Sequence, residues 1–225
     1  MFSAIIFDCD GVLVDSEALA YEVEVALLAE HGLSWEREDY VTRFMGLSYE
    51  AFHHAMDKEA LARLGRALPV TLREELAVRL RKTMEQRLTE IRGAAAAVKA
   101  IALPKAVASS STRAGLQRKL KQVGLWDAFA PHIYSAEDVV RAKPAPDLFL
   151  HAAAAIKAAP AGCLVIEDSV NGVTAARKAG MRVWGFLGGG HVDDGLGARL
   201  MRTGAERLIR DWAEFSFYLN PSVPR

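Results

Sequence analysis

The sequence is poor in cysteine, has no excess of either charge and contains no long apolar run. Only Cys9 and Cys163 occur among 225 residues, which excludes a disulfide-rich secreted scaffold. We expect two free thiols, although one disulfide between them stays open. Basic and acidic residues both number 28, whereas a nucleic-acid binder usually carries a basic excess. The composition therefore predicts a protein that does not bind nucleic acid.

The longest apolar runs fall short of the roughly 18 residues that a membrane-spanning helix needs. The first residues lack a basic segment before an apolar one and enter strand-like sequence almost at once. This pattern is not that of a secretory signal peptide. We therefore expect no membrane partner and a cytoplasmic location.

Hydrophobic residues make up 51% of the chain, enough for a substantial core. The stretch SAIIFD, residues 3–8, has the composition of a buried strand. From residue 18 to 92 the apolar spacing is helical, and no convincing strand interrupts it. Helices are expected here at 17–32, 34–44 and 72–91.

Strands and helices alternate after Gly93, which is typical of a parallel sheet with helices on both faces. The expected strands are KAVASSS, HIYSAED, CLVIEDS, RVWGFLGGG and ERLI, and helical segments separate them. The sequence thus predicts an α/β fold, a Rossmann-like parallel sheet core with an inserted all-helical cap domain. The predicted core is discontinuous, 1–16 plus 93–225, and the cap is 17–92.

Polar residues stand where the predicted strands end, and in parallel sheets ligands bind at that edge. Asp8 and Asp10 follow the first strand, Glu167 and Asp168 end another, and residues 109–111 are all serine. If the first strand continued through Asp10, both of its carboxylates would point the same way. Two carboxylates brought so close together would repel each other and would require a compensating cation or a shared proton.

Lys143 lies in a turn of the same sheet edge, in the stretch RAKPAPD. Several carboxylates together favour Mg²⁺, because oxygen ligands suit hard cations. Hydroxyl groups, a lysine and exposed amides suit a phosphate group. The combination indicates phosphoryl transfer, in which an aspartyl phosphate is a known type of intermediate.

Four stretches, FDCDGVLVDSE, VASSS, AKPAPD and VIEDSVNG, resemble the motifs of the haloacid dehalogenase-like hydrolase superfamily. The resemblance covers essentially the whole chain in order, including a helical insert after the first motif. It implies that Asp8 is the nucleophile and a magnesium ligand. It also implies that Asp10 is the general acid/base and ligates the metal through its carbonyl, and that Lys143 neutralises the nucleophile and the phosphate.

The same resemblance implies how phosphate and metal are held. Ser109 matches the phosphate-binding hydroxyl group, and Ser110 would add a backbone amide. Asp168 matches the acidic metal ligand, and Glu167 would bind the metal directly or through water. Ser111 is interpreted as a turn and N-cap serine.

Within the superfamily, Asp10 argues against dehalogenation, which needs neither a metal nor a second aspartate. A mutase of the β-phosphoglucomutase branch is the nearer alternative. That branch has a basic residue and an arginine in a cap loop where this chain has Met45 and Tyr49. It also has a histidine in the first cap helix, where this chain reads EALAYEV. We therefore expect a magnesium-dependent phosphatase acting on a small phosphate ester, most plausibly a sugar phosphate.

A catalytically idle binding module is the third interpretation, and an intact acid/base residue argues against it. Cap residues would contact the leaving group, and the candidates are Glu17, Arg43 and Tyr49. His31, His53 and His54 are interpreted as surface residues of the cap. The stretch GGGHVDDG is interpreted as a flexible loop whose position leaves open that it borders the site. The sequence does not determine the oligomeric state.

Overall fold

A computed structural model describes residues 2–44, 47 and 49–219. The chain divides into two compact units, Glu17–Arg87 and a larger one made of Met1–Ser16 and Leu88–Arg225. The cap predicted from the sequence, 17–92, includes residues 88–92, which this division assigns to the larger unit. Each unit has its own hydrophobic core.

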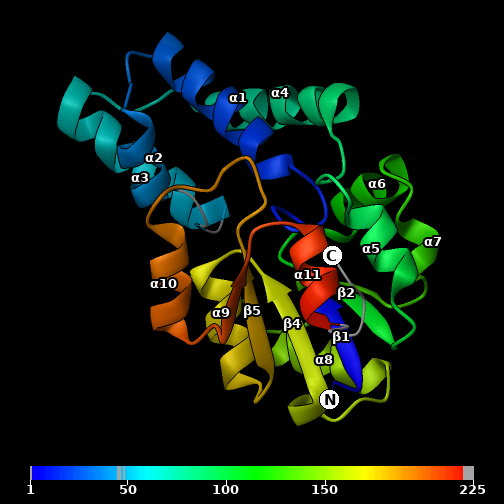
Figure 1. Cartoon of the computed structure of the whole chain (residues 1–225). Helices are drawn as coiled ribbons and strands as arrows, with labels where there is room; N and C mark the ends of the chain where they lie inside the picture. Colours follow the sequence, from blue (N-terminus) through cyan, green and yellow to red (C-terminus); the bar gives the residue numbers. More distant parts are fainter. Residues whose placement is uncertain (1, 45–46, 48, 220–225) are drawn as a thin grey trace. The chain divides into compact units, whose positions relative to one another are not determined.

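The larger unit alternates strands and helices along the chain (Figure 1). Its elements are β1 (Ala4–Phe7), α5 (Ala94–Ala100), β2 (Lys105–Ser109), α6 (Arg113–Gln122), α7 (Trp126–Phe129), β3 (Ile133–Ser135), α8 (Asp147–Ala155), β4 (Cys163–Glu167), α9 (Val170–Lys178), β5 (Arg182–Phe186), α10 (Leu196–Thr203), β6 (Arg207–Ile209) and α11 (Trp212–Leu219). The short 3₁₀ helices Ala136–Asp138 and Pro160–Gly162 precede α8 and β4.

The strands form one parallel sheet in the order β3-β2-β1-β4-β5-β6. β1 is central, and Phe7 at its end lies opposite Val107 of β2 and Ile166 of β4. After β1 the chain adds β2 and β3 on one side, and it then returns to add β4, β5 and β6 on the other side. Open parallel sheets bind ligands at this point of reversal, between β1 and β4. The predicted α/β, Rossmann-like fold class is confirmed.

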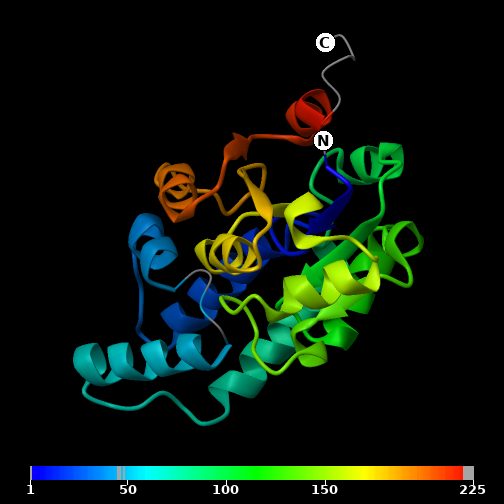
Figure 2. The same ribbon diagram turned by 90° about the horizontal axis from the view of Figure 1, so that it is seen from below.

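Alternate residues of the strands enter two different cores, as side-chain alternation requires. Ile6 of β1 and Val165 of β4 pack against α8, α9 and α10. On the opposite face, Phe7 meets the rings of Phe129, Trp212 and Phe215. Figure 2 shows α8 and α9 on one side of the sheet and α5 and α11 on the other.

The structure settles one point that the sequence left open, and it differs from the sequence-based expectations in its helices. β1 ends at Phe7 and does not continue through Asp10, which forms an isolated bridge with Val14 in the turn that follows. The helix expected at 72–91 ends at Arg87, because Glu90 also pairs with Val14 and its carboxylate accepts a hydrogen bond from Ala95 N. α10 had no counterpart among the expected elements.

The smaller unit is helical, as expected, and consists of α1 (Ser16–Glu30, whose first residue belongs to the larger unit), α2 (Arg37–Phe44), α3 (Tyr49–Leu64) and α4 (Leu72–Arg87). In its core, Tyr40 donates a hydrogen bond to Glu24 at 2.7 Å. Burial raises the pKa of Glu24 to about 7, although the Tyr40 hydrogen bond opposes that shift. His53 is buried at 3% exposure, so its interpretation as a surface residue is wrong. Its neighbour on α3, Phe52, is buried as well, which places this part of the helix against the core.

Within the described residues, no helix combines the length and the apolar character needed to cross a membrane.

Candidate functional site

The expected site residues of the larger unit gather at the carboxyl edge of the sheet, because the strands that carry them are neighbours. Asp8 directly follows β1, Glu167 ends β4 and Ser109 ends β2. β1 lies between β2 and β4, so residues more than 150 positions apart in sequence end side by side. All three are buried. The sheet topology therefore brings these three side chains of the larger unit together.

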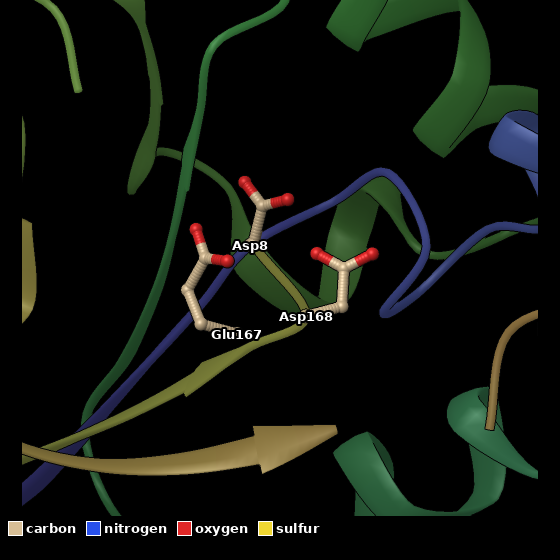
Figure 3. A group of neighbouring side chains, drawn as sticks. All are labelled: Asp8, Glu167 and Asp168. Atoms are coloured by element: carbon tan, nitrogen blue, oxygen red, sulfur yellow. The ribbon is translucent and has the colours of Figure 1, made fainter. Parts of the chain in front are cut away.

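Three carboxylates form a compact acidic cluster. Asp8, Glu167 and Asp168 each offer an oxygen, and these oxygens lie within 4.8 Å of one another. Figure 3 shows the three groups projecting to the same side from the ends of β1 and β4. Their exposures are 8%, 0% and 6%. Like charges at such separations repel strongly in a poorly solvated site, so the cluster requires nearby positive charge.

Lys143 supplies part of that charge. Its ammonium donates to Asp8 Oδ1 and to Glu167 Oε1, both at 2.7 Å, and its side chain is only 3% exposed. Burial raises the pKa of Asp8 well above its usual range; Lys143 opposes this shift, and the neighbouring carboxylates add to it. Although burial opposes the charged amine, Asp8 and Glu167 raise the pKa of Lys143. The lysine is thus held in its charged form beside the expected nucleophile.

Both carboxylate oxygens of Glu167 are engaged within the protein. Oε1 accepts from Lys143, and Oε2 accepts from the amide and the hydroxyl of Ser169, both at 2.9 Å. A Cβ atom on Gly172 would lie 1.7 Å from Oε1, so α9 approaches this side chain closely. Asp168, by contrast, accepts one contact from His191. Of these two neighbouring acids, Asp168 makes fewer hydrogen bonds within the protein.

Asp10 does not turn into the acidic cluster and has partners of its own. Lys119 and Ser16 donate to its Oδ1, while the Ser111 hydroxyl donates to Oδ2 at 2.6 Å and that of Ser109 at 3.3 Å. Burial alone would raise the pKa of Asp10. The charge and hydrogen bond of Lys119, together with the hydrogen bonds from Ser111 and Ser16, lower that pKa to about 2. The interpretation of Ser111 as an N-cap is wrong, because Thr112 caps α6.

The loop after β5 reaches the same edge through His191. Its Nε2 lies 3.0 Å from Asp168 Oδ2, and the residue is buried at 7% exposure. The amide of Gly190 donates to Asp15 Oδ1 at 2.9 Å, which fixes the loop to the turn after β1. The stretch interpreted as a flexible loop therefore does border the site. Among the residues that contact the expected site, sequence reasoning gave no role to Ser16, Lys119, Ser169 and His191.

Gly11 leaves no space for a side chain between these groups. Its φ is +72°, and a Cβ atom there would lie 1.8 Å from Asp168 Oδ2 and 2.7 Å from His191 Cε1. Gly11→Ala should lower the free energy of unfolding by about 1–3 kcal/mol from backbone strain, with a further loss from the displaced carboxylate. Chemical denaturation would measure both contributions together.

Gly180→Ala is the matched control, because Gly180 has φ +75° and nothing within 4 Å of its Cβ position. Gly180→Ala therefore introduces the same kind of backbone strain as Gly11→Ala but no close contact of the new Cβ atom. Equal losses of stability in the two variants would show that crowding at Asp168 has no energetic consequence.

The remaining expected residues have different surroundings. Ser110 is exposed in the middle of the serine run, and the role of its amide stays a prediction. In the smaller unit, Glu17 lies in the first turn of α1, and Arg43 donates to Glu59 at 3.3 Å. The side chain of Tyr49, like Met45 and Gly46, lies outside the described residues.

The donor set fits a divalent, oxygen-preferring cation. With every carboxyl group ionised, three carboxylates and one ammonium leave a formal excess of two negative charges at the centre of the cluster. All three candidate ligand groups are carboxylates, which suit Mg²⁺ rather than a metal bound by sulfur or imidazole. Fold and site together define an α/β protein with a buried carboxylate centre suited to a divalent cation.

A family model described as haloacid dehalogenase-like hydrolase matches residues 2–180. The chain is 31% identical over 189 residues to the 6-phosphogluconate phosphatase of Escherichia coli (strain K12), covering 84% of each chain. A hydrolase structure from Deinococcus radiodurans R1 with bound phosphate and sodium matches with a TM-score of 0.85 and 34% identity over 98% of this chain and 96% of the other. The chain belongs to the haloacid dehalogenase-like hydrolase family, as the sequence motifs predicted.

A structure described as a putative β-phosphoglucomutase from Thermotoga maritima is also similar. Its TM-score is 0.76 at 25% identity, with 98% of this chain and 100% of that chain covered. Phosphatases and mutase-like proteins thus share this fold, and the core alone does not separate them.

Proposed function

We propose that this protein, a phosphatase of the haloacid dehalogenase-like family, hydrolyses a small sugar phosphate through an aspartyl-phosphate intermediate. The observation that carries the proposal is the surroundings of Asp8. Its carboxylate ends the central strand, lies 2.7 Å from the buried Lys143 ammonium and shares a cluster with two further acids. A carboxylate in such a setting can serve as a nucleophile towards phosphorus once positive charge offsets the repulsion between anions.

In the proposed first step, a carboxylate oxygen of Asp8 bonds to phosphorus, and the bond from phosphorus to the leaving oxygen breaks. Asp10, in its protonated form, gives its proton to that oxygen, which requires that the negative charge of the bound phosphate raise the pKa of Asp10 above the value of about 2 found here. Lys143 offsets the negative charge of the nucleophile and the phosphate, while the Ser109 hydroxyl and the Ser110 amide bind phosphate oxygens. In the second step, water attacks the phosphorus of the acyl phosphate, Asp10 takes the proton, and inorganic phosphate leaves with Asp8 regenerated.

The proposed cofactor is Mg²⁺, held by Asp8, Asp168 and the backbone carbonyl of Asp10, with Glu167 as a closer or water-mediated partner. When bound, it supplies positive charge that offsets the carboxylates and the phosphate. Glu167 has both oxygens engaged by Lys143 and Ser169, which supports a water-mediated role. The engaged oxygens also give Glu167 a second task, which is to hold Lys143 in place.

We propose that residues 17–92 act as a cap domain that selects the alcohol portion of the substrate, with Glu17, Arg43 and Tyr49 as its candidate contacts. The relative that hydrolyses 6-phosphogluconate supports a sugar-like substrate. A cytoplasmic location is proposed as well, because both cysteines are free and buried.

A hexose-phosphate mutase is the alternative, supported by the similar structure from Thermotoga maritima. A mutase must hold a second phosphate in the cap tightly enough to exclude water. Arg43 is the cation that the sequence offers nearest to Gly46, and its guanidinium already pairs with Glu59, which also binds Arg63 at 2.8 Å. A cation that is already paired with a carboxylate is a weaker partner for a distal phosphate, which favours hydrolysis.

Incubation with Mg²⁺ and a hexose 1-phosphate or 6-phosphate should release inorganic phosphate with little isomer formed. Added hexose bisphosphate should not stimulate isomerisation. Phosphate release and sugar isomers would be quantified from the same reaction, with a chromogenic phosphate ester as a test for any activity at all. Isomerisation faster than phosphate release by about tenfold, a difference of about 1.4 kcal/mol in barrier, would replace the phosphatase proposal by the mutase. No turnover of any ester would favour an idle binding module.

A further inference from the structure

Lys119 gives the site a second, partly buried cation, separate from Lys143. Its ammonium forms an ion pair with Oδ1 of Asp10 and lies 3.0 Å from the hydroxyl oxygen of Ser111. The side chains of the pair are 19% and 16% exposed. Each of the two aspartates that follow β1 therefore has its own lysine. Asp8 pairs with Lys143 of the turn before α8, and Asp10 pairs with Lys119 of α6.

The fold holds Lys119 in this place through α6. The helix begins after Thr112, whose hydroxyl accepts a hydrogen bond from Gly115 N. Leu116 and Leu120 of α6 are buried, with exposures of 1% and 0%, so the helix cannot rotate without losing core contacts. Lys119 lies beside them in sequence, and its long side chain extends back towards the start of the helix, as helical side chains do. This direction brings its ammonium to the serine turn and Asp10.

The contacts fix the orientation of the Asp10 carboxyl group. Lys119 and Ser16 hold Oδ1, and Ser111 and Ser109 hold Oδ2, so rotation of the group would break several hydrogen bonds at once. A group that transfers a proton must be held within a fraction of an ångström of its working position. We infer that Lys119 is a positioning residue which, together with Ser111, aims the Asp10 carboxyl group at the leaving oxygen of the substrate.

This inference rests on the proposed function, because it assigns Lys119 a purpose only if Asp10 acts as acid/base. The competing role for a lysine at this edge is direct binding of the substrate phosphate. The two roles differ in what they affect. A positioning residue matters when the leaving group needs a proton, whereas a phosphate-binding residue matters equally for every phosphate ester.

The test compares Lys119→Met with the wild type on an alkyl phosphate, such as a sugar 6-phosphate, and on p-nitrophenyl phosphate, whose leaving group departs without protonation. Loss of general acid–base catalysis is worth about 10²–10⁴ in rate, so kcat/KM for the alkyl ester should fall by about 10². For p-nitrophenyl phosphate it should fall by no more than about threefold, because protonation contributes little there. Inhibition by inorganic phosphate should be unchanged.

Lys121→Met is the matched control, since Lys121 is an exposed lysine of the same helix whose ammonium lies over the ring of Trp126. It should leave both esters unaffected. Lys119→Arg should recover part of the alkyl-ester activity, and Ser111→Ala should reproduce the same selective loss in a variant that keeps every charge. Thermal melting of each variant separates selective loss from unfolding.

Equal losses for both esters, with weaker inhibition by phosphate, would overturn the inference in favour of phosphate binding. Unchanged kinetics in folded Lys119→Met would overturn it as well. Asp10→Asn serves as the reference for the proposed function. If it shows the selective loss and Lys119→Met does not, the inference alone fails. If Asp10→Asn lacks selectivity, the acid/base role of Asp10 fails, and the inference fails with it.

Discussion

Asp8→Asn should abolish turnover while leaving the fold intact. An amide is not a nucleophile towards phosphorus, so the aspartyl phosphate cannot form. The substitution is nearly isosteric, and it removes one of three crowded acids whose mutual repulsion the fold already tolerates. Lys143 keeps its ion pair with Glu167 in the variant, so no buried cation is left alone. Phosphate release under saturating Mg²⁺ would measure the loss.

Mass spectrometry of rapidly quenched enzyme should detect a phosphoryl adduct on the wild-type peptide that contains Asp8 and none on the variant. Asp194→Asn, at an exposed aspartate of the loop after β5, is the control and should retain full activity. Thermal unfolding should show that the Asp8 variant is folded. Turnover near the wild-type rate in a folded Asp8→Asn protein would refute the nucleophile assignment.

Removal of divalent cations should reduce activity to background, and Mg²⁺ should restore it. The acidic cluster retains two uncompensated negative charges after Lys143 is counted, and an approaching phosphate would add more. Ca²⁺ should support activity poorly, because it accepts more oxygen ligands in looser geometry and would misplace Asp8 for in-line attack. Titration of chelated enzyme with each cation, followed by phosphate release, would test both expectations.

Asp168→Ala should raise the Mg²⁺ concentration required for half-maximal activity far more than Glu167→Ala does. Both oxygens of Glu167 already accept hydrogen bonds from Lys143 and Ser169, whereas Asp168 keeps an oxygen available beside its contact with His191. Direct titration calorimetry with Mg²⁺ would provide a reading independent of turnover. Full activity in the presence of excess chelator would rule out a metal-dependent mechanism.

Much of the core site followed from sequence because parallel strands bring their carboxyl ends to one edge. Asp8, Lys143, Glu167 and Asp168 were each placed by the motif in which they occur, and the structure gathers all four. Asp10 shows the limit of that reasoning. Alternation along a strand would bring the two carboxylates together only if β1 continued through Asp10, but β1 ends at Phe7 and the following turn directs Asp10 to other partners.

Lys119 and His191 were beyond the reach of the sequence for physical reasons. The apolar spacing of α6 shows that Leu116 and Leu120 are buried, and a lysine between them has the pattern of a surface residue. Its partner lies 109 positions earlier, and nothing local to either residue records the pair. His191 lies in a glycine-rich loop without periodicity, and the hydrogen bond between Gly190 and Asp15 sets its place.

The position of β1 at the centre of the sheet has a consequence for synthesis of the chain. β1 is made before the other strands of this sheet, but its neighbours β2 and β4 comprise residues 105–109 and 163–167. On the ribosome, one edge of this apolar strand therefore stays without its native partner until Glu167 has emerged. Unpaired apolar strand edges promote aggregation. Asp8 is thus among the first site residues synthesised, but the strand before it pairs with β4 only late in synthesis. Truncation before β4 would therefore leave an aggregation-prone fragment rather than a weakened enzyme.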